Sequence, residues 1–509
     1  MSGSGDERAT DVVVVGAGFA GLYMLHRLRK LGLSVEVIEA GGGVGGTWYW
    51  NRYPGARCDV QSMEYSYSFD DDLQIEWEWS ERYAPQPEIL GYLDHVADRF
   101  DLRRDIRFDT RVVAAVFDEE RSDWLVTTDA GGRVRARFVV MATGCLSSAN
   151  LPDIDGRDSF VGASYHTGQW PHDGVDFTDQ RVGVIGTGSS AVQSIPIIAE
   201  QADHLTVFQR TPTYSVPAYN GPLDPDQVAQ IKADYPSLRD RNRMQVAGFG
   251  AQVPPPEGAA MDFTPEERQR TFEERWKIGG LSFLSAFVDL IINPDANEAA
   301  AEFVRGKIRQ IVNDPKVAAR LSPTQKIGCK RLCVDTGYYE TYNRPNVTLV
   351  DLQETPIEVI TPDGIQTSAG KVDLDAIVFA TGFDAMTGSL LKVDIRGRGD
   401  LPLAKAWEAG PVTYLGLGVP GFPNLFMITG PGSPSVLTNM VVSIEQHVDW
   451  IAGCIADLDA AGHATIEATP EATDQWVGYV NAVAGLTLFP SCNSWYLGAN
   501  GLGKPRVFR

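Results

Sequence analysis

A glycine-rich turn between a buried strand and a helix occurs twice in this chain, and this repetition constrains the fold more than any other feature. In the first copy an apolar run at 12–15 leads into Gly16, Gly18 and Gly21, and the strand after the helix ends on Glu39. Glycines at this spacing allow a tight turn that brings backbone N–H groups at the helix start close to a pyrophosphate. The flanking strand, helix and acidic residue together favour a dinucleotide-binding unit.

The second copy has the same order of elements, with a strand at 182–185, a helix at 192–199 and a strand at 205–208. The two copies differ in detail, which indicates two separate nucleotide sites and not a solenoid repeat. The residues of the second turn that we expect to contact a nucleotide are Gly186, Thr187, Gly188, Ser189 and Ser190.

The residues that end the two second strands predict different nucleotides. Glu39 can accept hydrogen bonds from a ribose diol, and its charge would repel a 2′-phosphate, so the first site suits FAD or NAD. In the second copy Arg210 and Thr211 stand at the corresponding place. Arginine offers a planar set of donors for phosphate, which predicts NADP there, although a surface arginine is the simpler alternative.

These patterns predict an α/β fold with two Rossmann-like dinucleotide-binding domains and a helical insertion. Strands at 138–142 and 376–380 are each followed by Thr-Gly and are expected to close the two domains. The stretch 218–328 breaks the rhythm, and Thr264 with Glu267 forms a capping-box pattern for a helix. We expect an FAD-binding domain at 1–150 and 385–509, an NADP-binding domain at 151–220 and 329–384, and a helical subdomain at 221–328 inserted in the NADP domain.

Charge and cysteine content restrict the partners and the compartment. The formal net charge is −22, which disfavours nucleic acid and anionic membranes as partners. The chain has no apolar run of membrane-spanning length, and its polar start resembles no secretion signal, so we expect a cytoplasmic protein. The six cysteines form no C-x-x-C pair, and we expect buried thiols rather than disulfides or metal ligands.

The segment after Glu39 narrows the flavin chemistry. Gly46, Thr47 and Trp48 are expected to contact FAD. Flavin disulfide reductases are similar in this region but carry a redox cysteine pair just after the Gly-Gly-Thr. Trp48 stands at that point here, and the later Cys58 has no partner nearby in the sequence, so thiol–disulfide catalysis is disfavoured.

Two long motifs resemble those of the Baeyer–Villiger monooxygenases. The segment 160–171 matches the family fingerprint, and 46–59 matches the second motif of the family. Lys330 and Arg331 stand where the family carries a Lys-Arg pair, and 430–435 is most similar to the phenylacetone and steroid monooxygenase branch. The resemblance covers nearly the whole chain. The fingerprint residues are Phe160, Gly162, His166 and Trp170.

The resemblance implies an enzyme that uses FAD, NADPH and O2 to convert ketones to esters or lactones, through a C4a-peroxyflavin and a Criegee-type adduct, with sulfide oxidation as a further activity. A flavin-dependent N- or S-hydroxylating monooxygenase and an NADPH oxidase remain the alternatives. Arg331 is then the catalytic cation beside the anionic species, and Asp59 pairs with it and contributes to cofactor binding. Lys330 becomes a second contact for the 2′-phosphate.

The remaining implied roles concern the linker, a mobile loop and the substrate pocket. His166 and Trp170 are expected in a linker between the domains, where His166 organises domain motion more than proton transfer. Trp495 resembles the tryptophan of a mobile loop that folds over NADP, with a core aromatic as the alternative. The ketone pocket is expected to include Ser433, Leu437 and Met440. Relatives usually continue past 504–508, which leaves a C-terminal cap on the flavin domain open. Aryl, cyclic and steroid ketones all remain open as substrates, and a monomer or weak homo-oligomer is expected.

Overall fold

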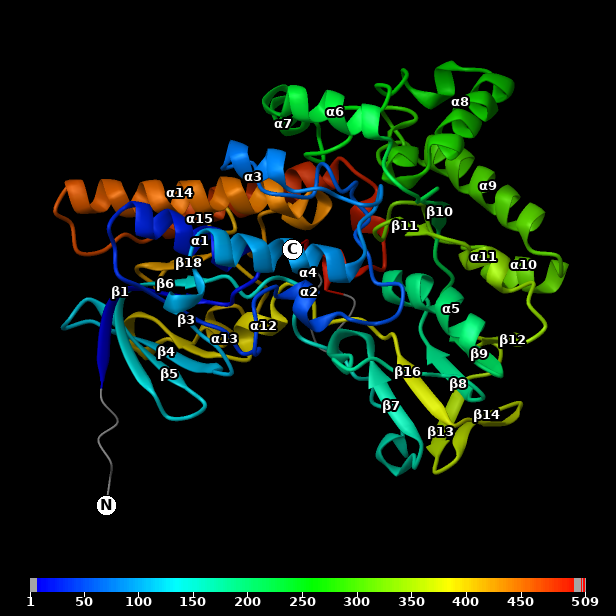
Figure 1. The fold of residues 1–509 in the computed structure, drawn as a ribbon, viewed down its shortest axis with the longest axis horizontal. Helices are drawn as coiled ribbons and strands as arrows, with labels where there is room; N and C mark the ends of the chain where they lie inside the picture. The colour runs from blue at the N-terminus through cyan, green and yellow to red at the C-terminus, as the bar shows by residue number, and fades with distance from the viewer. Residues whose placement is uncertain (1–6, 499–504, 506, 509) are drawn as a thin grey trace.

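Two open β-sheets, each with helices packed against it, organise the chain (Figure 1). The structure is a computed structural model and describes residues 7–498, 505 and 507–508. In Figure 1 the first sheet lies at the left beneath α14, and the second lies at the lower right. The predicted α/β class is confirmed.

The first sheet has eight strands in the order β17-β4-β5-β6-β1-β2-β3, with β18 paired to β6. Its central strand β1 pairs in parallel with β2 and β6, and Val12, Val13 and Val14 are fully buried in it. An uninterrupted apolar run is what a parallel strand covered on both faces requires. The strands are β1 (Arg8–Val15), β2 (Val35–Ile38), β3 (Ile106–Arg107), β4 (Val112–Asp118), β5 (Asp123–Thr128), β6 (Arg133–Met141), β17 (Asp394–Arg396) and β18 (Leu425–Met427).

Helices from both ends of the chain cover this sheet. The first turn feeds α1 (Phe19–Lys30), which packs against α14 (Met440–Ala460) from the C-terminal part. Asn439 caps α14 by accepting a hydrogen bond from the backbone of Val441. The other helices of the N- and C-terminal parts are α2 (Thr47–Trp50), α3 (Asp71–Glu76), α4 (Gln86–Arg99), α12 (Gly388–Leu391), α13 (Leu403–Ala406) and α15 (Pro470–Gly485).

The second sheet is fully parallel, in the order β12-β9-β8-β16-β7. Its strands are β7 (Ala163–His166), β8 (Arg181–Ile185), β9 (His204–Gln209), β12 (Val347–Asp351) and β16 (Ala376–Phe379). The helices α5 (Ser189–Gln201) and α11 (Tyr338–Thr341) pack beside it, and two small sheets flank it. These are β10 (Ser215–Pro217) with β11 (Cys333–Asp335), and β13 (Ile357–Thr361), β14 (Gly364–Thr367) and β15 (Gly370–Asp373).

Part of the fingerprint segment forms the edge strand of the second sheet. His166 ends strand β7, and β7 pairs with the neighbouring strand β16. Trp170 is 3% exposed in the core of the second domain. Backbone pairing along a sheet edge, which no local pattern encodes, therefore fixes this segment.

The predicted helical stretch packs against both domains rather than forming one subdomain of the second. It contains α6 (Pro225–Ala233), α7 (Tyr235–Arg243), α8 (Pro265–Ile278), α9 (Pro294–Ile311) and α10 (Pro315–Leu321). Tyr235 and Leu238 belong to the core of the first domain, whereas Phe272 and Phe303 belong to the core of the second. The predicted capping box at Thr264 and Glu267 is present at the start of α8. Figure 1 shows α6 and α7 at the top of the molecule, α8 and α9 at the upper right, and α10 at the right beside α11.

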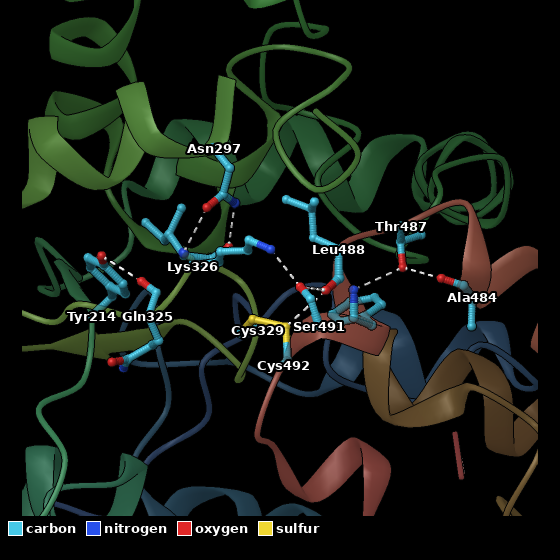
Figure 2. Close-up of a disulfide and its surroundings, with 12 residues drawn as sticks. Tyr214, Asn297, Gln325, Lys326, Cys329, Ala484, Thr487, Leu488, Ser491 and Cys492 are labelled. Carbon is cyan, nitrogen blue, oxygen red and sulfur yellow. Dashed lines mark hydrogen bonds between the residues drawn. A yellow bond between two sulfur atoms is a disulfide. The ribbon is translucent and has the colours of Figure 1, made fainter. Parts of the chain in front are cut away.

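Two of the six cysteines form a disulfide, so the expectation of buried thiols alone is wrong for Cys329 and Cys492 (Figure 2). They are 163 residues apart in the sequence, but their Cα atoms lie 5.5 Å apart, within the range that a disulfide spans. Only the tertiary fold brings them together. Cys58, Cys145 and Cys333 are buried free thiols, and Cys454 is partly buried.

Within the described ranges no helix is both long and apolar enough to cross a membrane. The same residues contain no group of three or more His, Cys, Asp and Glu side chains arranged to hold a metal ion.

Candidate active site between the two domains

The first glycine turn forms a close-packed cradle at the start of α1. Gly16 has φ +107°, and a Cβ there would lie 2.6 Å from the carbonyl oxygen of Ala142 at the end of β6. Gly18 and Gly46 face each other so closely that a Cβ on Gly46 would lie 2.9 Å from the Cα of Gly18. No side chain caps the N-terminus of α1. Its free N–H groups and the small residues around them fit the pyrophosphate of a dinucleotide.

Glu39 is fixed beside this cradle. Its two carboxylate oxygens accept hydrogen bonds of 2.7 Å from the backbone N–H groups of Ala17 and Gly41. Burial raises the pKa of Glu39, and these hydrogen bonds oppose the rise. The side chain therefore has one orientation at the strand end, where a ribose diol of FAD would lie.

Of the two residues that follow Gly46, one is exposed to solvent and the other is buried in the core. Thr47 is exposed at the start of α2 and available to a ligand. Trp48 is 7% exposed, packs in the core of the first domain and donates from Nε1 to the hydroxyl of Tyr65 at 3.3 Å. Its side chain thus supports the cradle from behind. Gly21 has a similar packing role, since a Cβ on it would lie 1.8 Å from the carbonyl oxygen of Gly16.

The second turn repeats the first in its packing and leaves more room. Gly186 has φ +114°, and a Cβ there would lie 2.4 Å from the carbonyl oxygen of Ala380, just as Gly16 meets Ala142. A Cβ on Gly188 would meet no atom within 4 Å, and no side chain caps the α5 N-terminus there. Thr187 donates from Oγ1 to the carbonyl of Thr211 at 2.8 Å, so its hydroxyl ties the turn to the end of β9.

The serines that begin α5 point in different directions. Ser189 is exposed, and its Oγ lies 3.4 Å from Sγ of Cys333. Ser190 is partly buried and lies near Tyr53 of the first domain, where it opposes the rise that burial causes in the pKa of Tyr53. Ser189 is therefore the more accessible of the two for a phosphate at the helix start.

Two cations lie together at the end of β9. Burial lowers the pKa of Lys330, and the nearby positive charge of Arg210 lowers it further. Neither side chain forms an ion pair with a carboxylate in the described residues, although Arg210 accepts at its backbone carbonyl from Gln353. Two like charges without a carboxylate between them are costly to bring together, and a phosphate dianion would offset that cost.

Arg331 and Asp59 meet across the junction of the two domains. Nε of Arg331 donates to Oδ2 of Asp59 at 2.5 Å and Nη2 donates to Oδ1 at 2.9 Å, while Nη1 donates to the carbonyl of Val436 at 3.0 Å. Burial alone would lower the pKa of Arg331, but Asp59 raises it by more, so the net shift is upward. Arg331 therefore stays charged, and two of its five N–H groups remain for a ligand.

The residues around Val436 form the apolar wall of this site. Leu437 and Met440 pack in one cluster with Tyr496 and Cys145, close to Arg331. Ser433 instead bonds within its own turn, to the carbonyl of Gly430 and the hydroxyl of Ser435, each at 2.7 Å. Of the three expected pocket residues, Leu437 and Met440 thus pack against the apolar cluster that contains Val436.

The fingerprint residues lie in the framework of the second domain. His166 is 5% exposed, burial lowers its pKa, and its Nδ1 accepts from the backbone of Gly168 at 3.0 Å. Phe160 packs against the core beside β16, and a Cβ on Gly162 would lie 2.4 Å from the carbonyl of Asp375. These contacts indicate that the fingerprint residues have a structural role in the second domain.

Sequence reasoning missed Gln193, which links the two domains from the middle of α5. Its Oε1 accepts from the hydroxyl of Tyr53 at 2.8 Å, and its Nε2 donates to the carbonyl of Arg57 at 3.0 Å. Gly55 has φ +81°, and a Cβ there would lie 2.3 Å from the backbone oxygen of Gln193. Gln193 therefore holds the segment that leads to Asp59. The sequence gives no signal for this role, because Gln193 is one of several polar residues on α5, among them Ser194, Glu200 and Gln201.

Sequence reasoning also selected Trp495 and passed over its neighbour. Tyr496 is 2% exposed, and Arg331 and Asp59 influence its pKa, which burial raises. Trp495 is only partly buried beside it, with the two ring centroids 4.2 Å apart. A Trp-Tyr pair gives no indication of which ring turns inward until the surrounding chain is folded.

Comparison with known proteins decides the family. A family model described as pyridine nucleotide-disulphide oxidoreductase matches residues 13–246. A Baeyer-Villiger monooxygenase from Pseudooceanicola batsensis is 46% identical over 97% of this chain and 90% of its own length. The chain belongs to the Baeyer–Villiger monooxygenase family. The family model covers both glycine turns. In the present chain Trp48 stands where the disulfide reductases carry cysteine.

Two further proteins are similar to this Baeyer–Villiger monooxygenase. The solved structure of an oxidised steroid monooxygenase bound to NADP is 58% identical and has a TM-score of 0.93, covering 98% of this chain and 94% of that one. This agrees with the predicted similarity to the steroid branch. A phenazine N-monooxygenase from Lysobacter antibioticus is 45% identical over 98% of this chain and 92% of its own length.

Proposed function

We propose that this Baeyer–Villiger monooxygenase converts ketones to esters or lactones, using FAD, NADPH and O2, and that sulfides are further substrates. Bound FAD supplies the redox chemistry that passes electrons from NADPH to O2. The observation that carries the proposal is the double hydrogen bond between Asp59 and Arg331, which holds a permanent cation at the domain junction. A cation held in one place stabilises negative charge that develops on a substrate oxygen.

We propose the following division of work among the residues. Arg331 uses its two remaining N–H groups on the oxygen of the ketone carbonyl as that oxygen gains charge, and Asp59 keeps the guanidinium in position. Leu437 and Met440 contact the apolar part of the ketone. His166 is a positioning residue, because its buried ring and lowered pKa favour a neutral structural role over proton transfer.

The nucleotide sites follow from the two turns. We propose that Gly16, Gly18, Glu39, Gly46 and Thr47 hold FAD. The NADP contacts are proposed to be Gly186, Gly188, Ser189, Arg210, Thr211, Lys330 and Trp495. The FAD-binding domain then comprises 1–150 and 385–509, and the NADP-binding domain 151–220 and 329–384, with the helical stretch shared between them. We further propose that the enzyme is cytoplasmic and a monomer or weak homo-oligomer.

Product analysis tests the proposal. The FAD-loaded enzyme is incubated with NADPH, labelled O2 and a panel of aryl, cyclic and steroid ketones, and we expect an ester or lactone that carries one labelled oxygen atom. A phenazine is included because one relative is named for phenazine N-oxidation. N-oxide without any ester would replace ketone oxidation by N-oxidation as the function. Hydrogen peroxide in equal amount to NADPH, with no oxygenated product, would make the enzyme an oxidase.

A further inference from the structure

The disulfide between Cys329 and Cys492 joins two chain segments that are far apart in the sequence (Figure 2). Cys329 directly precedes Lys330 and Arg331 in the second domain. Cys492 lies in the segment 486–498, here called the closing segment, which follows α15 and ends just past Tyr496. The bond therefore fixes a part of the C-terminal chain to the segment that carries the two candidate site cations.

The anchor on the Cys329 side is rigid. Asn297 of α9 donates from Nδ2 to the carbonyls of Leu290 and Ile327, both at 2.8 Å, and accepts from the backbone of Ile327 at 3.2 Å. The hydroxyl of Tyr214 lies 2.9 Å from the carbonyl of Gln325, to which it donates. Figure 2 shows these bonds from Asn297 and Tyr214 holding the loop just before Cys329. A segment bonded at several buried points moves little, so it can serve as a fixed support.

The closing segment also makes polar contacts with that support. Nζ of Lys326 donates to Oγ of Ser491 at 2.6 Å, and the backbone of Leu488 donates to the carbonyl of Ile291 at 2.9 Å. The bond between Lys326 and Ser491 is exposed. An exposed polar contact contributes little to holding a segment in place, because water competes for both groups. The disulfide adds a covalent link between Cys492 and the second domain.

The inner face of the closing segment lies against the site. Tyr496 packs with Cys145, Ala385, Met386 and Val436, and the pKa of Tyr496 responds to the charges of Arg331 and Asp59. Val436 is the residue whose carbonyl accepts from Arg331 at 3.0 Å. Displacing the closing segment would therefore open one wall of the Arg331 site to water.

We propose that Cys329 and Cys492 are positioning residues, whose disulfide holds the closing segment against the Lys330–Arg331 segment and whose reduction releases it. The inference rests on the proposed nucleotide site at Arg210 and Lys330. Reduction by a small dithiol breaks the S–S bond, adds two electrons and two protons to give two thiols, and converts the dithiol to its disulfide. Both cysteines are at most 7% exposed, so reduction proceeds through local opening.

The expected consequence is weaker nucleotide binding in the reduced enzyme. When only a tenth of the molecules hold the closing segment in place, the apparent Kd for NADP+ rises about tenfold, because the ordered state must form before binding. The thermal unfolding of the first domain should change little, since the disulfide lies outside its core.

The experiment uses the FAD-loaded enzyme, oxidised with a small-molecule disulfide or reduced with a dithiol. Titration after denaturation should give four thiols in the oxidised form and six in the reduced form, from the six cysteines of the sequence. NADP+ binding should weaken about tenfold on reduction. Cys329→Ser, Cys492→Ser and the double variant should each bind NADP+ like the reduced enzyme and no longer respond to dithiol. Cys454→Ser, which alters a free thiol on α14, is the matched control and should respond like the unaltered enzyme.

Two results would overturn the inference. One is six titratable thiols after oxidation, and the other is an NADP+ Kd that is equal in the oxidised and reduced enzyme. Neither measurement requires a ketone. If NADP+ binding responds to the dithiol while no ester forms with any ketone, the proposed function fails and the positioning role stands. If esters form while NADP+ binding does not respond, the positioning role fails alone.

Discussion

Removing the carboxylate of Asp59 gives the most direct test of the site. Asp59→Ala deletes both acceptors of Arg331 in the first domain and leaves the guanidinium with its single bond to Val436. Removing one partner of a fully buried ion pair costs about 3 to 5 kcal/mol. Each side chain of this pair is 23% exposed, so water compensates part of the loss, and we expect about 2 kcal/mol.

We expect the transition state, in which Arg331 must stay on the charged oxygen, to lose the same energy when Asp59 no longer holds the guanidinium. This loss corresponds to a fall of about 30-fold in kcat/KM for ester formation, since 1.36 kcal/mol is a factor of ten in rate. The assay is a double-mutant cycle of Asp59→Ala, Arg331→Ala and the double variant, with NADPH in excess. Because Asp59 acts through Arg331, its removal should have no further effect in the Arg331→Ala background. Asp59→Asn keeps one acceptor oxygen and should lose about tenfold, an intermediate effect.

The control is Asp240→Ala, which breaks an exposed ion pair with Arg243 on α7 and should leave ester formation unchanged. Equal losses from Asp59→Ala in the presence and absence of Arg331 would refute the reasoning, because they would mean that Asp59 acts independently of the guanidinium. A loss of flavin from Asp59→Ala, detected by absorbance before the assay, would assign the effect to cofactor binding instead.

Three further predictions concern the nucleotide, the domain contact and pH. Arg210→Ala should raise the KM for NADPH at least tenfold and leave that for NADH unchanged; equal effects on both would remove its phosphate role. Gln193→Met keeps the length of the side chain but removes its hydrogen bonds to Tyr53 and Arg57. It should lower kcat/KM about tenfold, because the chain before Asp59 is then held less firmly. The control is Glu200→Gln at an exposed position of the same helix, which should have no effect. Burial raises the pKa of Asp335 from 3.8 to about 6. The folded state therefore binds the carboxyl proton of Asp335 more tightly than the unfolded state does. As pH rises from about 4 to 6, this carboxyl group lowers the free energy of unfolding. The unfolding temperature of Asp335→Asn, measured relative to that of the unaltered enzyme, should therefore increase over this pH range. A difference between the two unfolding temperatures that stays constant with pH would contradict the raised pKa.

The sequence predicts the two nucleotide-binding units well because their signals are local. A buried parallel strand, a glycine turn and a helix lie within a short stretch, and steric limits at Gly16 and Gly186 demand glycine whatever the rest of the chain does. The residues at the ends of the second strands, Glu39 and Arg210, separate the two nucleotides by charge alone. The pairing of Asp59 with Arg331 followed only from resemblance to a family, since the two are 272 residues apart.

Other features depend on which surfaces meet. The helical stretch reads as one insertion because its helices share a composition, yet Tyr235 packs in the first domain and Phe303 in the second. The linker role of the segment ending at His166 was only implied by the family resemblance, and its strand β7 is short and lies at a sheet edge, where its neighbour β16 defines it. The sequence of neither segment shows which surface of the protein it packs against.

The sequence by itself predicted the two nucleotide-binding units, because turn sterics, strand burial and charge at fixed spacing depend on neighbouring residues. The family followed from the resemblance of the motifs at 46–59 and 160–171. The tertiary structure alone decided that Cys329 meets Cys492, that Tyr496 rather than Trp495 faces Arg331, and that Gln193 holds the segment before Asp59. Each of these depends on contacts between residues far apart in the sequence. Such contacts form only when the two domains have packed together.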